Sequence, residues 1–421
     1  MRPRDGRPRR RRPRRQGPGT DSTSTALGAS PLPLTGTDTV TGPAAVTDTS
    51  AVTGTGARRH RRPLRWLAAV ATLLVVVAAG YAGLVLHRSR DTVDLPQPPG
   101  PYAVGRVEDT ATDSARHGRR LSIWTWYPAI AGTGRPAVYA PDGWQRLAIG
   151  LPLGQTRLDR VHDRALEAAA PAPGRFMTVV LAPGLGFAAP QYAALAEDLA
   201  SRGYVVVGVT PTGSANVTVL DEQVTGPTSD GNPSDFNGEQ SPHDQAIAQH
   251  LLDVWVPDLR FAADTTAQLP GSTRLADHVV PDAVTYVGHS FGGTSALAAC
   301  HVDRRCRAAV DLDGALYGPV AREGLPVPVL LVQHDGSCIA AACTPSADTD
   351  RADVAAAQRF IAASTGPVRR ETMAGSGHLD FTDDGLYYWA LPLRRLLGLG
   401  DAGGRQVLGR TAAIVAETLG R

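Results

Sequence analysis

A serine stands in the middle of a glycine-rich pentapeptide, Gly-His-Ser-Phe-Gly, at residues 288–292. The apolar run 283–287 before it is typical of a strand, and the small residues after it are typical of a helix. A sharp turn between strand and helix needs small residues on both sides of a nucleophile, and it exposes the serine hydroxyl. The helix N-terminus also directs amide groups at developing negative charge. The pattern therefore predicts that Ser290 is a catalytic nucleophile.

A serine nucleophile needs a base, and His378 fits that role best among the 11 histidines. It follows the last expected strand and both candidate acids, which gives the chain order nucleophile, acid, histidine. His289 lies inside the serine turn, where packing or hydrogen bonding suits it better than catalysis. Asp313 and Asp335 end successive expected strands. Position alone leaves both open as the acid that orients His378.

A second glycine-rich turn, at residues 182–187, follows an earlier expected strand and reads Ala-Pro-Gly-Leu-Gly-Phe. Acyl transfer needs two backbone amides that stabilise the oxyanion. One is expected from Phe291, directly after the serine. The glycines around Leu185 allow its amide to approach the substrate carbonyl, so Leu185 is the expected second donor.

Short β-rich runs alternate with helical patterns from residue 102 onward, which predicts an α/β fold with a mostly parallel sheet covered on both faces. The expected strands are 121–127, 178–181, 204–209, 283–287, 308–312, 327–332 and 369–373, and the expected helices are 191–201, 245–268, 291–301 and 351–363, with others beyond 385. The long irregular stretch 211–242 is typical of a functional lid or a disordered insertion. One hydrolase domain over 102–421 accounts for these elements.

Four segments together resemble the secreted platelet-activating factor acetylhydrolase family of α/β-hydrolases. They are LAPGLGFAAPQYAALAEDLASRGYVVVGV at 181–209, GHSFGG at 288–293, DLDGALYGP at 311–319 and GSGHLDF at 375–381. The resemblance implies Asp313 rather than Asp335 as the acid, and Leu185 and Phe291 as the oxyanion donors. It also implies a calcium-independent hydrolase of short or oxidised acyl esters. Pro183 stands where family members often carry histidine.

The four cysteines lack the spacing of a zinc site, so no metal and no cofactor are expected. Cys300 and Cys306 bracket the link from the serine helix to the next strand, and Cys338 and Cys343 bracket a loop beside the site. Two local disulfides are therefore feasible in an oxidising exterior. All 42 basic residues are arginine, which excludes a lysine nucleophile or Schiff base.

The formal net charge of +2 is the sum of two segments whose net charges have opposite signs. Fourteen arginines and four aspartates up to Arg65 give +10, which leaves −8 for the rest. Residues 1–62 are rich in Arg and Pro, then in Thr and Gly, so they cannot bury enough apolar surface to fold and are expected to be disordered. We interpret this arm as a solvated determinant of topology with loose attraction to the inner leaflet, and expect no nucleic-acid partner.

Residues 66–86 contain no charge and, as a helix, span roughly 32 Å, the thickness of a bilayer core. Five arginines at 58–65 precede this run and two follow it, which predicts a cytoplasmic N-terminus. A single transmembrane helix with its flanks at 63–90 and a Pro-rich spacer at 91–101 are therefore expected before the domain. A cleaved signal peptide is the alternative, but this apolar run is longer than the usual one.

Together these patterns predict a cell-membrane protein, anchored by one helix, whose extracytoplasmic domain is a serine esterase. Its expected partner is a small-molecule or lipid ester, cleaved through an acyl-enzyme on Ser290. A polyester or lipid hydrolase of the same fold is one alternative, and a non-catalytic cell-envelope binding module is the other. The nucleophile, base, acid candidates and glycine turns together favour an enzyme.

Overall fold

The structure is a computed structural model that describes residues 61–147 and 154–420. Almost all of the arm expected at 1–62 lies outside the described residues. The chain divides after Arg65 into two units, and the second contains every element below except the first turn of helix α1.

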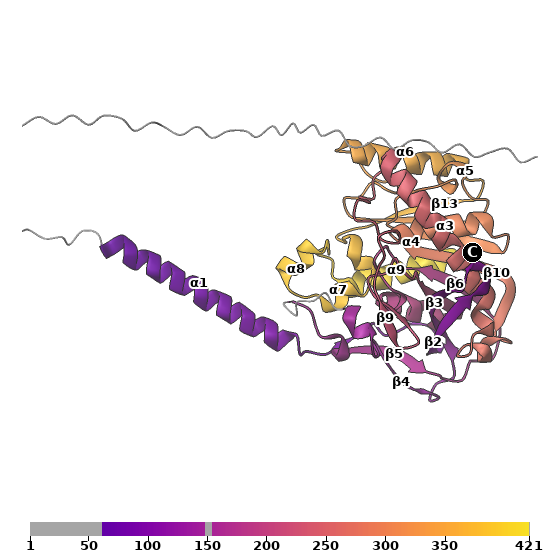
Figure 1. The fold of residues 1–421 in the computed structure, drawn as a ribbon, viewed down its shortest axis with the longest axis horizontal. Coiled ribbons are helices and arrows are strands. Elements are labelled where there is room, and N and C mark those ends of the chain that lie inside the picture. Colours follow the sequence, from indigo (N-terminus) through magenta and orange to yellow (C-terminus); the bar gives the residue numbers. More distant parts are fainter. Residues whose placement is uncertain (1–60, 148–153, 421) are drawn as a thin grey trace, which may run out of the picture. The chain divides into compact units, whose positions relative to one another are not determined.

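The main sheet has eleven strands among the described residues, in the order β1-β5-β2-β3-β7-β6-β10-β11-β12-β13, with β4 beside β5 (Figure 1). The strands are β1 Val93–Asp94, β2 Ala103–Asp113, β3 Arg119–Ala129, β4 Arg135–Val138, β5 Val161–Glu167, β6 Phe176–Ala182, β7 Tyr204–Thr210, β10 Val279–His289, β11 Cys306–Leu312, β12 Val329–His334 and β13 Val368–Met373. From β7 to β13 every neighbouring pair is parallel, whereas β2 and β3 pair antiparallel with each other, and β3 with β7. The expected mostly parallel sheet is confirmed.

Helices cover both faces of this sheet, as a parallel sheet requires. The α-helices of the domain are α2 Ala193–Ser201, α3 Pro242–Thr265, α4 Phe291–Val302, α5 Val320–Glu323, α6 Asp348–Ala363, α7 Asp384–Tyr387, α8 Leu391–Leu396 and α9 Gly404–Leu419. Short 3₁₀ turns are η1 Ser114–Arg116, η2 Trp144–Leu147, η3 Leu158–Arg160, η4 Ala189–Tyr192, η5 Thr266–Gln268, η6 Thr273–Leu275 and η7 His378–Phe381. Helices α3, α4 and α6 contribute to one apolar core, and α2 and α9 to a second core.

Strand β2 was not predicted from the sequence, because buried charged residues interrupt its apolar pattern. Arg106 is buried and pairs with Asp163, and Asp109 accepts hydrogen bonds from the Gly271 amide at 2.6 Å and the Ser272 hydroxyl at 2.9 Å. Such pairing satisfies the charges inside the fold. The strand therefore looks like a polar loop in the sequence.

Residues 91–101, the expected Pro-rich spacer, pack against the domain. Val93–Asp94 adds to the sheet beside β5, Leu95 is fully buried, and the Gly100 amide donates to Ser201 Oγ at 3.0 Å. The prolines suggested an extended linker, but Leu95 fills an apolar core and fixes the segment on the domain.

The irregular stretch 211–242 contains a small hairpin, β8 Thr218–Leu220 and β9 Gln223–Thr225. Asp221 and Glu222 form its two-residue turn with positive φ values of 45° and 68°. The amide of Asn216 bonds the Gly186 carbonyl at 2.9 Å, which joins this stretch to the predicted oxyanion turn.

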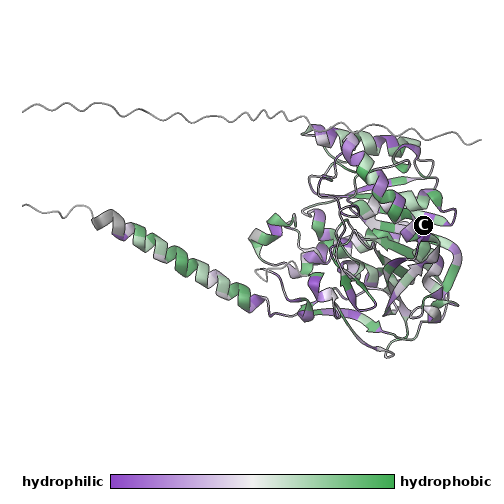
Figure 2. Cartoon of the chain, viewed as in Figure 1, coloured by the Kyte–Doolittle hydropathy of each residue, from purple (hydrophilic) through white to green (hydrophobic). Residues whose placement is uncertain are grey.

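Helix α1 spans Arg61–Arg88 and includes the apolar run 66–86. Figure 2 shows hydrophobic residues along most of its length. The 24-residue section Arg65–Arg88 is long and apolar enough to cross a bilayer, and little of it is buried inside the protein. By length and composition this helix is one candidate membrane span.

Candidate active site

Ser290 occupies a strained turn between β10 and α4. Its φ of 56° and ψ of −127° are rare for a residue with a side chain. A Cβ on Gly288 would lie 1.9 Å from the Gly292 carbonyl oxygen, and one on Gly292 would lie 2.2 Å from the Pro183 oxygen. The turn therefore needs both glycines, as its sequence pattern predicted, and it presents Ser290 at a cavity.

The structure brings Ser290, His378 and Asp313 together, although 88 residues separate the first two. Ser290 Oγ lies 3.0 Å from His378 Nε2, and His378 Nδ1 lies 2.5 Å from Asp313 Oδ2. Because a carboxylate accepts, Nδ1 carries the proton and Nε2 is free to accept from the serine. This tautomer is the one that a general base requires.

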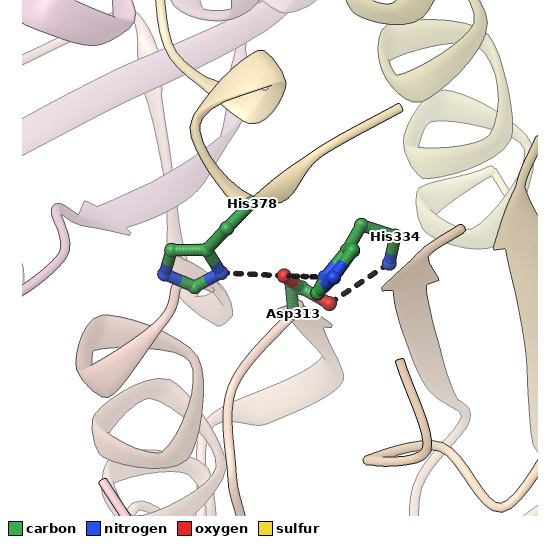
Figure 3. Close-up of side chains that lie close together, drawn as sticks. All are labelled: Asp313, His334 and His378. Atoms are coloured by element: carbon green, nitrogen blue, oxygen red, sulfur yellow. Dashed lines mark hydrogen bonds and ion pairs between the residues drawn. The ribbon is translucent and has the colours of Figure 1, made fainter. Parts of the chain in front are cut away.

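Asp313 accepts hydrogen bonds from a second histidine as well, which Figure 3 shows beside the first. The His334 amide donates to Asp313 Oδ1 at 2.8 Å, and His334 Nδ1 donates to Oδ2 at 2.6 Å. Burial by itself raises the pKa of Asp313, but the donors on His334 and His378 outweigh it and hold this pKa below its usual range. Asp313 is therefore an anion at neutral pH.

The alternative acid, Asp335, does not contact His378 through any hydrogen bond of the described structure. Its Oδ2 accepts from the Gly375 amide at 2.9 Å, which fastens the loop that precedes His378. Strand β12 ends at His334, and successive side chains point to opposite faces, so the Asp335 side chain points away from the His334 side chain. Position in the sequence left both Asp313 and Asp335 as candidates for the acid. In the structure, Asp313 is the one of the two that hydrogen-bonds His378.

The predicted oxyanion donors, Leu185 and Phe291, both line the cavity at Ser290. Phe291 is the first residue of α4, where backbone amides have no partner within the helix. The glycine turn passes so close that a Cβ on Gly184 would lie 3.3 Å from Ser290 Cβ. Gly186 has a φ of 85°, which turns the chain back beside Leu185.

A series of largely buried hydrogen bonds links this turn to His378, and we name Tyr192 and His289 the tyrosine–histidine relay. The Gly184 amide lies 2.9 Å from the Tyr192 hydroxyl, which lies 2.8 Å from His289 Nδ1. His289 Nε2 lies 2.9 Å from the His378 carbonyl oxygen.

Only one arrangement of protons satisfies this relay. The His378 carbonyl only accepts, so His289 Nε2 must donate. Burial lowers the pKa of His289 to about 3, so the ring is neutral and its Nδ1 must accept from the Tyr192 hydroxyl. The hydroxyl oxygen in turn accepts from the Gly184 amide. The relay connects the turn at Gly184, the turn at Tyr192 and the loop at His378. His289 therefore serves as a hydrogen-bonding residue and not as a base.

The cavity at Ser290 has a volume of about 350 Å³ and an aromatic wall. The ring centroid of Phe236 lies 5.9 Å from that of Phe291 and 5.9 Å from that of Tyr317. Phe236 belongs to the stretch 211–242, so that stretch forms part of the wall. The lining residues are Leu185, Phe236, Asn237, Gly238, Ser290, Phe291, Asp313, Ala315, Tyr317, His334, Ser337, Ile339 and His378.

All four cysteines are paired in the structure. Cys300–Cys306 joins the end of α4 to the start of β11, and Cys338–Cys343 closes the loop after β12. These are the two pairs that the sequence made feasible. Because Ser337 and Ile339 line the cavity, the second disulfide constrains part of its rim.

Comparisons with known proteins identify the fold. No family description and no curated sequence matches the chain. A solved ferulic acid esterase from Streptomyces cinnamoneus is 26% identical, with a TM-score of 0.61 over 77% of this chain and 91% of that one. The chain has the α/β-hydrolase fold.

Two other solved structures are more distant. A dienelactone hydrolase-like promiscuous phosphotriesterase from metagenomic libraries is 15% identical, with a TM-score of 0.41 over 75% of this chain and 99% of that one. A dienelactone hydrolase from Anabaena variabilis is also 15% identical, with a TM-score of 0.37 over 74% and 96%.

Sequence reasoning missed His334 and Tyr192. His334 stands directly before Asp335, at the end of a strand, and this position was the one sign in the sequence that it could lie near the site. Tyr192 lies in the turn before α2 and carries no motif.

Proposed function

We propose that this chain is a membrane-anchored serine carboxylesterase. The observation that carries the proposal is the hydrogen-bonded series from Ser290 through His378 to Asp313, which opens onto a cavity. The ferulic acid esterase neighbour supports ester hydrolysis as the reaction class. A binding module has no need of a strained serine joined to a correctly protonated histidine.

The reaction begins when His378 Nε2 takes the proton of Ser290 Oγ, which attacks the ester carbonyl carbon. The amides of Leu185 and Phe291 stabilise the resulting oxyanion. Asp313 orients His378 and stabilises the imidazolium that forms. As the intermediate collapses, the proton passes from His378 to the departing alcohol. Water then repeats these steps on the acyl-enzyme and releases the acid.

Compact acyl groups suit the cavity better than long chains. Its volume of about 350 Å³ lies near the lower end of ligand pockets, which run from about 300 to 1,000 Å³. The rings of Phe236, Phe291 and Tyr317 offer apolar surface to an acyl group. Short-chain esters and the acyl esters of modified phospholipids, as the resemblance to the platelet-activating factor acetylhydrolases implies, are the proposed substrates.

Helix α1 is the proposed anchor, with the N-terminus in the cytoplasm and the domain outside the cell membrane. The arginines before the span outnumber those just after it, and positive flanks stay in the cytoplasm. Two disulfides in the domain suit an oxidising exterior. Protease treatment of intact cells is expected to degrade a C-terminal tag and spare an N-terminal one.

A fluorophosphonate probe tests the mechanism in the full-length protein, solubilised in detergent. Wild type is expected to be labelled and Ser290→Ala to remain unlabelled. Ser295→Ala is a matched control, because Ser295 is buried one turn further along α4 and only donates to the Phe291 carbonyl at 2.8 Å. Equal labelling of wild type and Ser290→Ala would refute the assignment.

An ester panel from acetyl to palmitoyl then separates the competing functions. Preference for short acyl groups supports the proposed substrate class. A preference for palmitoyl esters or for a polyester film indicates a lipid or polyester hydrolase. No turnover by a folded protein indicates a binding module.

A further inference from the structure

His334 is one histidine more than serine hydrolysis requires. A triad carboxylate serves a single imidazole, yet Asp313 Oδ2 accepts from Nδ1 of His378 at 2.5 Å and from Nδ1 of His334 at 2.6 Å. Both rings direct Nδ1 at the same oxygen, His334 from the end of β12 and His378 from the start of η7 (Figure 3). Two imidazole nitrogens and a carboxylate that converge on one point are the donor set of a transition-metal site.

The three donors lie close enough together to reach one zinc ion after small side-chain rotations. Zinc binds imidazole nitrogen at about 2.0–2.1 Å and carboxylate oxygen at about 2.0–2.2 Å, so neighbouring ligands of a tetrahedral ion lie about 3.3 Å apart. Here each nitrogen is 2.5 or 2.6 Å from the oxygen, and no two of the three ligand atoms are more than 4.8 Å apart. Side-chain rotations that open the two short distances therefore create the site, without movement of the sheet.

Charge and access also favour a cation. Asp313, His334 and His378 all line the cavity, and the two histidine side chains are 30% and 39% exposed, so an ion and a water ligand can reach them. Two more carboxylates, Asp335 and Asp380, exert an attractive electrostatic effect on a positive His334. These two carboxylates add to the negative charge that Asp313 supplies to a bound cation.

We propose that Asp313, His334 and His378 form an inhibitory Zn²⁺ site. Zinc coordinates Nδ1 of both histidines and one oxygen of Asp313. The proton displaced from each Nδ1 moves through solvent to Nε2 of the same ring, so no proton is gained or lost. His378 Nε2 then donates instead of accepts, and it cannot take the proton of Ser290. Zinc binding is independent of turnover, whereas the inhibition rests on the proposed function.

Binding is tested first in the full-length Ser290→Ala protein, by competition with a chromophoric zinc indicator. We expect one zinc per chain, and a loss of affinity of about 100-fold after His334→Asn, because removal of a direct ligand exceeds the effect of an outer partner. His162→Asn is the matched control, since it removes an exposed histidine that pairs with Asp94 at 2.9 Å. Asp313→Asn removes a second ligand, and circular dichroism checks that each variant is folded. Zinc affinity unchanged in folded His334→Asn would overturn the site.

Inhibition is tested next with p-nitrophenyl acetate. Zinc is expected to inhibit wild type reversibly, with recovery in EDTA, and Mg²⁺ at equal concentration to have no effect because it prefers oxygen ligands. The half-inhibitory concentration, taken relative to each variant's own uninhibited rate, should rise about 100-fold in His334→Asn. Equal sensitivity of the two proteins overturns the proposal. Zinc binding by a protein that never hydrolyses an ester refutes the esterase and keeps the site.

Discussion

Tyr192→Phe isolates the tyrosine–histidine relay, because it removes one buried oxygen atom and leaves the ring in place. Without the hydroxyl, the Gly184 amide loses its acceptor and His289 Nδ1 loses its donor. Tyr192 is fully buried, so water does not replace the oxygen. Each of the two unsatisfied buried groups costs about 1–3 kcal/mol, so we expect the free energy of unfolding to fall by about 2–6 kcal/mol.

The relay also predicts a loss of rate. It fixes the glycine turn beside Leu185 and the backbone of His378, and a displacement of about 1 Å in such a site lowers the rate by about 100-fold. We expect kcat to fall at least about 10-fold, with a smaller change in KM, because transition-state groups move more than the cavity wall. Urea unfolding followed by tryptophan fluorescence measures stability, and p-nitrophenyl acetate hydrolysis measures kcat and KM.

Tyr286→Phe is the matched control for this experiment. Tyr286 is equally buried, and its hydroxyl donates to Asp303 Oδ2 at 2.7 Å, while Arg305 continues to bond that carboxylate. It should lose about 1–2 kcal/mol of stability and keep its kcat. If both variants lose stability and neither loses kcat, the relay is structural and does not position the catalytic groups.

Three further predictions address the acid, the buried charge and the cavity. Asp313→Asn should lower kcat about 10⁴-fold, and Asp335→Asn should leave kcat within about 10-fold of wild type; the reverse order would exchange their roles. Burial raises the pKa of Asp384 to about 6, so its stabilising protonated form is lost as the pH rises from about 4 through 6. Asp384 should contribute a fall of up to about 3 kcal/mol in the unfolding free energy across that window, and Asp384→Asn should remove this contribution. Phe236→Ala should enlarge the cavity and raise the octanoyl-to-acetyl rate ratio about 10-fold, and an unchanged ratio would place the acyl group elsewhere.

The sequence specified the parallel half of the sheet because those strands are buried on both faces. Runs such as 204–209 and 283–287 are almost continuously apolar, which is typical of a covered parallel strand. Strand β2 was missed for the opposite reason. Its buried charges are satisfied by partners such as Asp163 and Ser272, which are far away in the chain, and a local pattern cannot show partners at that separation.

Ser290 and His378 were predicted from local signals and Asp313 was selected by the family resemblance, whereas the neighbours of these residues depend on register. Leu312 lies opposite Val332 in the β11–β12 pairing, so the ends of the two strands bring Asp313 and His334 together. A shift by one residue would turn His334 to the other face of the sheet. Pairing register is a tertiary property, so the place of His334 before Asp335 could not by itself indicate its bond to Asp313 or the proposed zinc site.

Backbone strain at the site is offset by the same sheet. Ser290 and Asp313 both have positive φ values, 56° and 63°, a conformation that costs each about 1–3 kcal/mol. The amide of Ser290 bonds the Leu312 carbonyl at 2.8 Å, and that of Asp313 bonds the Val332 carbonyl at 2.8 Å. Each strained residue thus makes the last backbone hydrogen bond between two parallel strands. The separation of Ser290 and Asp313 is consequently set by strand order rather than by flexible side chains, which is why the short motif around the serine supports the proposed catalysis only at the end of β10.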